Sequence, residues 1–168
     1  MKIPLLLASL ALFALACEKP PRALRASSTP FAGGGLGPPA PLAAAQTHAK
    51  WTDVKAPAAM DAGKSYSAQA TIQNDGSAGW VNMPPGLNGL NTVRVSYHWN
   101  RPDGTVAVFD GVRTDLPQPV GPGESVRMAA IQVTAPPAPG DYRLVFDVLQ
   151  EGVRWLNSFP APIPVTIR

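Results

Sequence analysis

Few residues of this chain have side chains that could act in catalysis or bind a metal ion. The 168 residues include one cysteine, Cys17, and two histidines, His48 and His98. A serine hydrolase needs a histidine beside an activated serine, but Ser96 lies two residues from His98 on one face of a predicted strand, about 7 Å away. The sequence contains no G-x-S-x-G motif and no metal-ligand spacing. It therefore predicts a protein that is not an enzyme and that holds no metal or other cofactor.

The first seventeen residues have the pattern of an export signal that ends in a cysteine. A positively charged start, Met1-Lys2, precedes a mostly apolar run from Ile3 to Leu15. As a helix this run would span about 20 Å, which is too short for a bilayer core of about 30 Å. Residues 1–16 are therefore typical of a signal peptide.

The end of this segment, Ala14-Leu15-Ala16-Cys17, resembles a bacterial lipobox. In bacterial lipoproteins the cysteine of that motif is acylated, with chains such as palmitate, and the signal peptide is removed just before it. The resemblance implies a lipidated Cys17 and a location in the cell envelope, on the extracytoplasmic side, in the periplasm or at the cell surface. Ordinary secretion is the alternative, because the same residues satisfy the A-x-A rule. We favour lipidation because the one cysteine of the chain stands where a lipobox needs it.

Residues 17–50 have the composition of a disordered tether rich in Pro, Gly and Ala. Four basic side chains and Glu18 give this segment a net charge of +3, whereas residues 51–168 carry nine basic and ten acidic groups. The basic excess therefore lies beside the anchor, where anionic headgroups would attract it. The alternative is a solvated linker whose charges have little effect. A nearly neutral domain also excludes a strongly basic nucleic-acid binder.

Residues 51–168 have the two-residue apolar period of β-strands. The predicted strands occupy residues 65–74, 91–99, 105–109, 125–133, 141–149, 153–156 and 163–167. Turn sequences such as Asn74-Asp75-Gly76 separate them, and a phase shift at Ala130–Ile131 predicts a β-bulge. About seven short strands predict an all-β, immunoglobulin-like antiparallel sandwich, preceded by the signal peptide and the tether.

Several motifs of this domain occur in an order that resembles a known class of module. They are Asn74-Asp75-Gly76 with Trp80, Ser96-Tyr97-His98-Trp99, Phe109-Asp110-Gly111-Val112-Arg113-Thr114, Val120-Gly121-Pro122-Gly123-Glu124 and Gln150-Glu151-Gly152-Val153-Arg154-Trp155. The order resembles the immunoglobulin-like modules appended to bacterial cell-surface and polysaccharide-handling proteins, and more distantly the four-tryptophan domain of autophagy cargo receptors. The resemblance implies the fold. It leaves function open, because such modules bind proteins or glycans or act as spacers.

Aromatic residues divide between the predicted core and the predicted surface. Trp99 shares its face with valines and is expected in the core. Trp51 is expected to hold the first strand in place, and Trp80 to close one end of the sandwich. The burial of Trp155 stays open. Tyr142 opens a strand after Pro139-Gly140-Asp141, which is the position of a tyrosine corner; a buried tyrosine without that hydrogen bond is the alternative.

A partner surface is predicted where the strands 91–99 and 141–149 pair, as they do in immunoglobulin-like sandwiches. The outward side chains of this pair, with neighbours at the rim, are the candidate partner-binding residues: Arg94, His98, Arg113, Arg143, Asp147 and Trp155. Arginine is favoured at protein interfaces. A solvated face whose charges only keep the domain soluble is the alternative.

Together these features predict a non-catalytic, lipid-anchored accessory subunit that docks on a protein partner at the membrane surface. The alternative is a carbohydrate-binding module for cell-surface polysaccharide, with Trp155 as a stacking residue. A third hypothesis, protease inhibition by the loop 84–91, rests on fold analogy alone.

Overall fold

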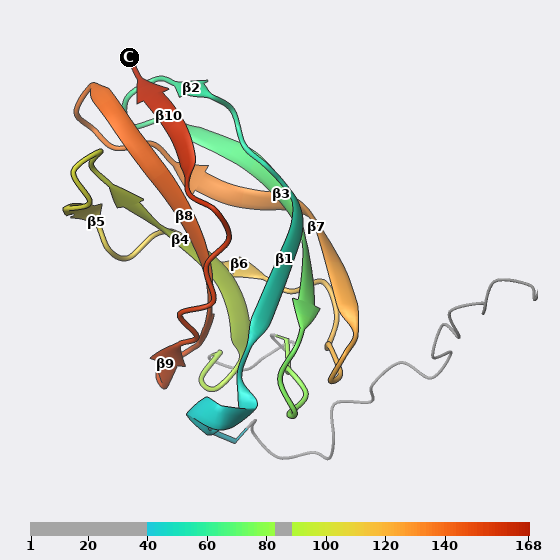
Figure 1. Ribbon diagram of the computed structural model, residues 1–168. Helices are drawn as coiled ribbons and strands as arrows, with labels where there is room; N and C mark the ends of the chain where they lie inside the picture. Colours follow the sequence, from blue (N-terminus) through green and yellow to red (C-terminus); the bar gives the residue numbers. More distant parts are fainter. Residues whose placement is uncertain (1–39, 83–88) are drawn as a thin grey trace, which may run out of the picture.

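The computed structural model describes residues 40–82 and 89–168 of the chain (Figure 1). The predicted signal peptide, Cys17, most of the tether and most of the loop 84–91 lie outside the described residues. The described part is built from strands and one short 3-10 helix, η1 (Ala44–Gln46). In these two ranges, no helix has the length and apolar character needed to cross a membrane.

Ten strands form two sheets that pack face to face (Figure 1). The smaller sheet has the order β1 (Ala49–Lys55), β3 (Ser65–Asn74), β7 (Ser125–Thr134). The larger sheet has the order β2 (Ala59–Met60), β10 (Ile163–Ile167), β8 (Gly140–Gln150), β4 (Val93–Asn100), β5 (Val106–Val108). Two further short strands join it, β6 (Thr114–Asp115) beside β4 and β9 (Arg154–Trp155) beside β8. This confirms the predicted immunoglobulin-like β-sandwich, and each of the seven predicted runs contains a strand.

The core lies between the sheets and is filled by the inward side chains of the alternating strands. On β4 these are Val93, Val95, Tyr97 and Trp99, all of which are buried. Trp80 is buried as well, and its backbone pairs with Val120, so the predicted burial of Trp80 and Trp99 is confirmed. Trp51 lies in β1, stacks on Phe146 with ring centroids 6.1 Å apart, and donates its indole N–H to the Ser158 carbonyl.

The domain begins before residue 51, where the sequence analysis placed its start. Ala49 is buried and opens β1. Further upstream, the buried amide of Gln150 accepts a hydrogen bond from the Leu42 N–H (2.7 Å) and donates one to the Ala40 carbonyl (2.8 Å). Residues 40–50 therefore pack on the sandwich although their composition has no strand period. The Gln150 amide holds the first of them, and backbone hydrogen bonds from Ser77 and Asp75 to the carbonyls of Gln46 and His48 hold the rest.

Both neighbours of β3 carry a β-bulge at the same level. In β7, Ala68 pairs with Ile131 and Ala70 with Met128, so two residues of β7 face Gln69. This confirms the bulge predicted from the phase shift. In β1 the register shifts between Thr52 and Lys55.

Tyr142 forms the predicted tyrosine corner. Its ring is buried, and its hydroxyl donates a hydrogen bond to the Ala138 carbonyl at 3.0 Å. We expect Tyr142→Phe to lower the free energy of unfolding by about 1 kcal/mol, since it removes one net hydrogen bond without changing the packing. Urea denaturation followed by tryptophan fluorescence measures this change. An unchanged midpoint would show that the corner bond adds nothing to stability.

Candidate functional site

The strands β4 and β8 pair as predicted, and their register places Ser96 opposite Asp147 and His98 opposite Val145. The candidate side chains therefore share the outer face of the larger sheet, as expected. The expectation that the side chains of this face are exposed is wrong at its centre, because His98 is only 7% exposed and Asp147 is fully buried. A second layer, formed by the loop 109–113, the segment 156–159 and the side chain of Trp155 on β9, covers them.

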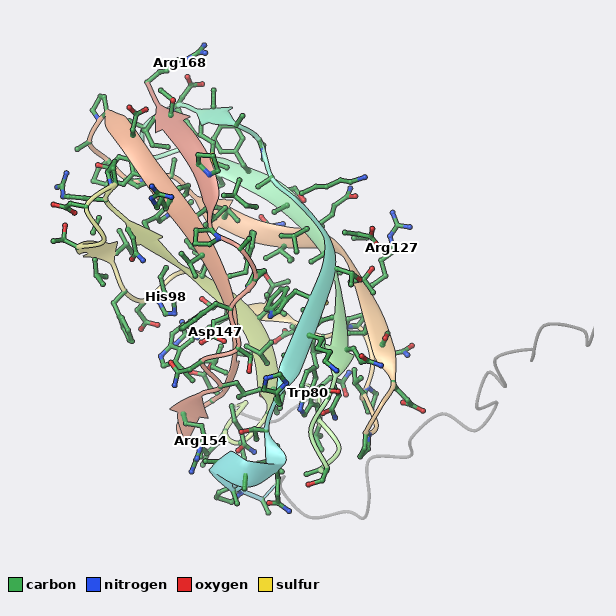
Figure 2. The ribbon with its side chains drawn as sticks, viewed as in Figure 1. Trp80, His98, Arg127, Asp147, Arg154 and Arg168 are labelled. Carbon is green, nitrogen blue, oxygen red and sulfur yellow. The ribbon has the colours of Figure 1, made fainter. Side chains whose placement is uncertain are left out.

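Asp147 holds part of this second layer in place. Its carboxylate accepts hydrogen bonds from the backbone N–H groups of Val148 (2.7 Å), Asn157 (3.1 Å) and Ser158 (3.1 Å). The His98 side chain lies beside the same carboxylate, with its Nε2 4.0 Å from Asp147 Oδ2. In Figure 2 both residues lie near each other on the β4–β8 side of the molecule. Asp147 is thus a structural anchor for the segment that follows β9.

His98 is the base of an aromatic cluster, which consists of His98, Phe109, Trp155 and Phe159. The centroid of its ring lies 4.4 Å from Trp155, 4.8 Å from Phe109 and 6.1 Å from Phe159, and its Nδ1 contacts the Phe109 carbonyl. The two phenylalanines are 58% and 51% exposed. The cluster therefore has a buried base and an apolar rim that is open to solvent.

Arg113 fixes the side of the cluster nearest the loop 109–113. Its guanidinium carbon lies 5.0 Å from the centre of the Trp155 ring, a cation–π contact. The same group pairs with Glu151 at 3.2 Å and contacts the Asp110 carboxylate. The predicted residues Arg113 and Trp155 therefore do belong to one site, but they are bound to each other.

The other two candidate arginines do not join the cluster. Arg94 is only 16% exposed, and its Nε lies 2.7 Å from Asp115 on β6. It approaches the network around Arg113 only through Glu151, at 3.9 Å. Arg143 is exposed and lies opposite Asn100, at the other end of the β4–β8 pair from Arg94. The expectation that these arginines form one exposed docking surface with His98 is therefore wrong.

Sequence reasoning missed the exposed rim of the cluster. Phe109 ends the predicted strand 105–109 and Phe159 lies outside every predicted strand, so neither was recognised as an exposed residue. The sequence does carry one sign that the loop 109–113 packs on β4, which is Gly111. Its N–H donates a hydrogen bond to the Tyr97 carbonyl at 3.0 Å. A Cβ there would lie 2.6 Å from that carbonyl oxygen, so only glycine allows the loop to pack this closely on β4.

The chemistry available at this site is non-covalent contact. Phe109, Phe159 and the 46% exposed Val112 supply apolar surface, and the charged groups of Arg113 and Glu151 border it. An open depression of about 560 Å³ adjoins Phe159 and is lined on its other side by residues 48–52. Within residues 40–82 and 89–168, His, Cys, Asp and Glu side chains form no group of three that could hold a metal ion.

Comparisons with known proteins give likenesses of fold. No family model and no curated protein matches the chain. Among solved structures, the chain is similar to the CARDB domain of the PF1109 protein from Pyrococcus furiosus, solved in complex with di-metal ions (19% identity, TM-score 0.39, covering 73% of this chain and 94% of that chain). It is also similar to an ASH/PapD-like domain of human CEP192 (10% identity, TM-score 0.28, covering 82% and 95%). These likenesses concern immunoglobulin-like folds alone, so the function must be argued from the site itself.

Proposed function

We propose that this protein is a non-catalytic, lipid-anchored accessory subunit of the cell envelope that docks on a protein partner through its aromatic cluster. The observation that carries the proposal is the pair of half-exposed rings, Phe109 and Phe159, on a buried base. Contiguous exposed apolar surface on a soluble domain marks interaction sites, and aromatic anchors supply much of the binding energy at protein interfaces.

The packing beneath these rings supports a docking role. The Asp147 carboxylate fixes the backbone just before Phe159, and the close approach of Gly111 to β4 fixes the loop that follows Phe109. Anchors that are already held in place lose little conformational entropy on binding. The cluster is therefore suited to bind a partner without rearranging.

The anchor part of the proposal rests on the sequence. Acyl chains on Cys17 would hold the protein on the extracytoplasmic side of a membrane, and more than one chain gives stable attachment. The tether between Cys17 and residue 40 would let the domain reach a partner above the membrane surface.

Polysaccharide recognition is the second candidate, because exposed rings can also stack on sugars. The structure favours Phe109 and Phe159 for that role over Trp155, the residue selected from the sequence. Trp155 is only partly exposed, has the Arg113 guanidinium over its ring, and packs on His98. A sugar would have to displace Arg113 to use that face of the ring.

The test compares capture by the full chain with capture by the double variant Phe109→Ser/Phe159→Ser. Affinity purification from mild detergent should retrieve a stoichiometric protein with the wild type, and the variant should retain less than about a tenth of it. Val106→Ser is the matched control, since Val106 is 56% exposed but outside the cluster. Circular dichroism confirms that each variant is folded.

A wild-type protein that is captured alone, or a double variant that keeps its partner, would overturn the docking proposal. The same proteins are then incubated with cell-wall polysaccharide. Retention that the double variant loses, in the absence of a protein partner, would favour the second candidate.

A further inference from the structure

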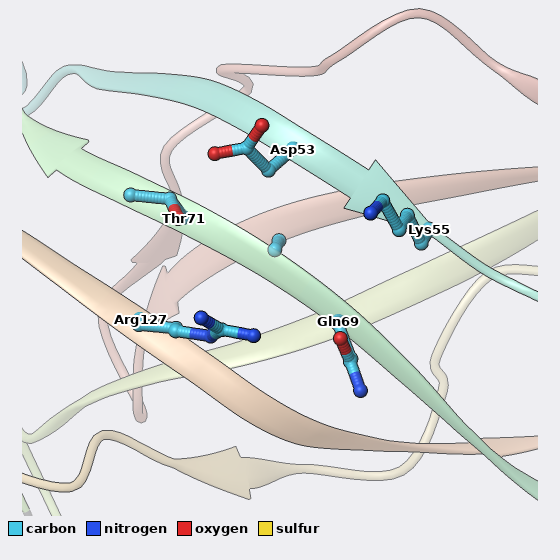
Figure 3. Close-up of a pocket in the computed structure, with 6 residues that line it drawn as sticks. Asp53, Lys55, Gln69, Thr71 and Arg127 are labelled. Carbon is cyan, nitrogen blue, oxygen red and sulfur yellow. The ribbon is translucent and has the colours of Figure 1, made fainter.

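A second feature lies on the opposite outer face of the sandwich, on the sheet β1–β3–β7. It is a depression of about 130 Å³ lined by Asp53, Lys55, Gln69, Ala70, Thr71 and Arg127. In Figure 3 Arg127 reaches from β7 toward β3, while Asp53 and Lys55 lie on β1 at the other side. The aromatic cluster contributes no residue to it.

The depression lies where the two bulged strands flank β3. Two residues of β7 face Gln69, and the register of β1 shifts between Thr52 and Lys55. Asp53, inside that shift, has a φ of +52°, a left-handed conformation that is uncommon for a residue other than glycine. Bulges re-aim side chains and occur often beside functional sites. Here they bring polar groups from three strands to one place.

The polar side chains of the depression have no partner among the described residues. No hydrogen bond or ion pair there involves the side chains of Asp53, Lys55, Gln69, Thr71 or Arg127. By contrast, Lys50 on the same strand is paired with Asp75 at 2.9 Å. The depression thus offers two free cations, one free carboxylate, an amide and a hydroxyl.

We propose that this depression binds one acidic sugar unit of a larger saccharide. Lys55 and Arg127 would pair with the carboxylate of the sugar, and charge-assisted hydrogen bonds of this kind are the strong ones. Gln69, Thr71 and the Asp53 carboxylate would bind its hydroxyl groups. The volume is below the roughly 300–1,000 Å³ of sites that enclose a whole small molecule, so it suits one unit of a chain that continues into solvent.

The lining residues argue against other anionic ligands. None of them is aromatic, and nucleic-acid bases are held on single-stranded sites largely by stacking. Their one apolar member is Ala70, so the site has no surface for acyl chains. Asp53 repels a bare phosphate and the carboxylate of an acidic sugar alike, but the sugar also carries hydroxyl groups that donate hydrogen bonds to the Asp53 carboxylate, which offsets the repulsion.

The experiment is calorimetric titration of the detergent-solubilised full chain with oligogalacturonate, with a neutral galactose oligomer and with inorganic phosphate. Oligogalacturonate should bind at least about tenfold more tightly than either of the others. Lys55→Gln/Arg127→Gln should weaken its binding by at least about tenfold. The control Lys64→Gln/Arg168→Gln makes the same charge change at exposed residues outside the depression and should bind like the wild type.

A second variant tests the sugar itself. Asp53→Asn keeps a residue that tolerates a left-handed backbone, so folding should be unaffected. It should weaken oligogalacturonate binding and strengthen phosphate binding. Equal binding of the acidic and neutral oligomers, an equal loss in the control variant, or stronger oligogalacturonate binding by Asp53→Asn would overturn the proposal.

This inference stands apart from the proposed docking function. Phe109→Ser/Phe159→Ser should bind oligogalacturonate like the wild type, because the two sites lie on opposite sheets. A failure of partner capture therefore leaves the saccharide test intact, and a failure of the titration leaves the docking proposal intact.

Discussion

Asp147→Ala is expected to lower the free energy of unfolding by about 3 kcal/mol or more. The substitution removes a fully buried carboxylate that accepts three backbone hydrogen bonds. Hydrogen bonds to charged groups are worth about 1.5–3 kcal/mol each, and an unsatisfied buried N–H costs about 1–3 kcal/mol. The N–H groups of Asn157 and Ser158 would regain part of this loss if the segment opens to water. Urea denaturation monitored by tryptophan fluorescence gives the change in free energy.

Two control variants test whether the loss of stability in Asp147→Ala comes from removal of the carboxylate. Asp147→Asn keeps one acceptor oxygen and should lose less stability than the alanine variant. Asp141→Ala removes an exposed carboxylate of the same strand, which bonds the Thr166 hydroxyl at 2.9 Å, and should cost about 0.5 kcal/mol. If Asp147→Ala unfolds at the wild-type urea concentration, the carboxylate does not anchor the segment 156–159.

A folded Asp147→Ala protein would also report on the binding site. Phe159 follows directly after Ser158, whose N–H the carboxylate holds. Loss of that bond should loosen Phe159 and reduce partner capture, while Phe109, which is carried by another loop, keeps its place. Partner capture should therefore fall less than in the double phenylalanine variant.

The alternation of apolar residues was enough to predict the longer strands, and the pairing of β4 with β8 followed from the likeness to immunoglobulin-like sandwiches. It located β3, β4, β7 and β8, and the phase shift at Ala130–Ile131 located the bulge in β7. The strands β2 and β6 were missed because two residues cannot show a period. The strand β1 was not among the predicted strands, because its first residues continue the Ala-rich composition of the tether and its bulge at Asp53 interrupts any alternation.

The candidate surface was predicted less well than the fold, for a physical reason. A period of two shows which side chains share a face, and His98 and Asp147 do share one. It does not show what covers that face. Here the cover consists of the loop 109–113, the segment 156–159 and the Trp155 ring. The loop and the segment are held by single side chains, one close glycine contact and isolated backbone hydrogen bonds rather than by a continuous ladder. Polar residues were therefore taken as exposed, while the exposed Phe109 and Phe159 went unnoticed.

Cys17→Ser is expected to abolish both fatty-acid labelling and membrane retention. In cells fed radioactive palmitate, the wild type should be labelled and should sediment with the membranes. The serine variant lacks the thiol that diacylglycerol alkylates in bacterial lipoproteins, so it should be unlabelled. It retains only the basic residues of the tether as membrane contacts, each worth about 1 kcal/mol near an anionic surface.

A salt wash separates the two modes of attachment. Basic residues are screened at high ionic strength, whereas acyl chains in the bilayer are not. The wild type should therefore stay with the membranes in 1 M salt, and any Cys17→Ser protein found there should be released. A wild-type protein that is unlabelled and soluble would contradict the anchor and favour ordinary secretion. Since Cys17 lies outside the described domain, the released variant should still capture the partner through Phe109 and Phe159, which distinguishes loss of the anchor from loss of the binding site.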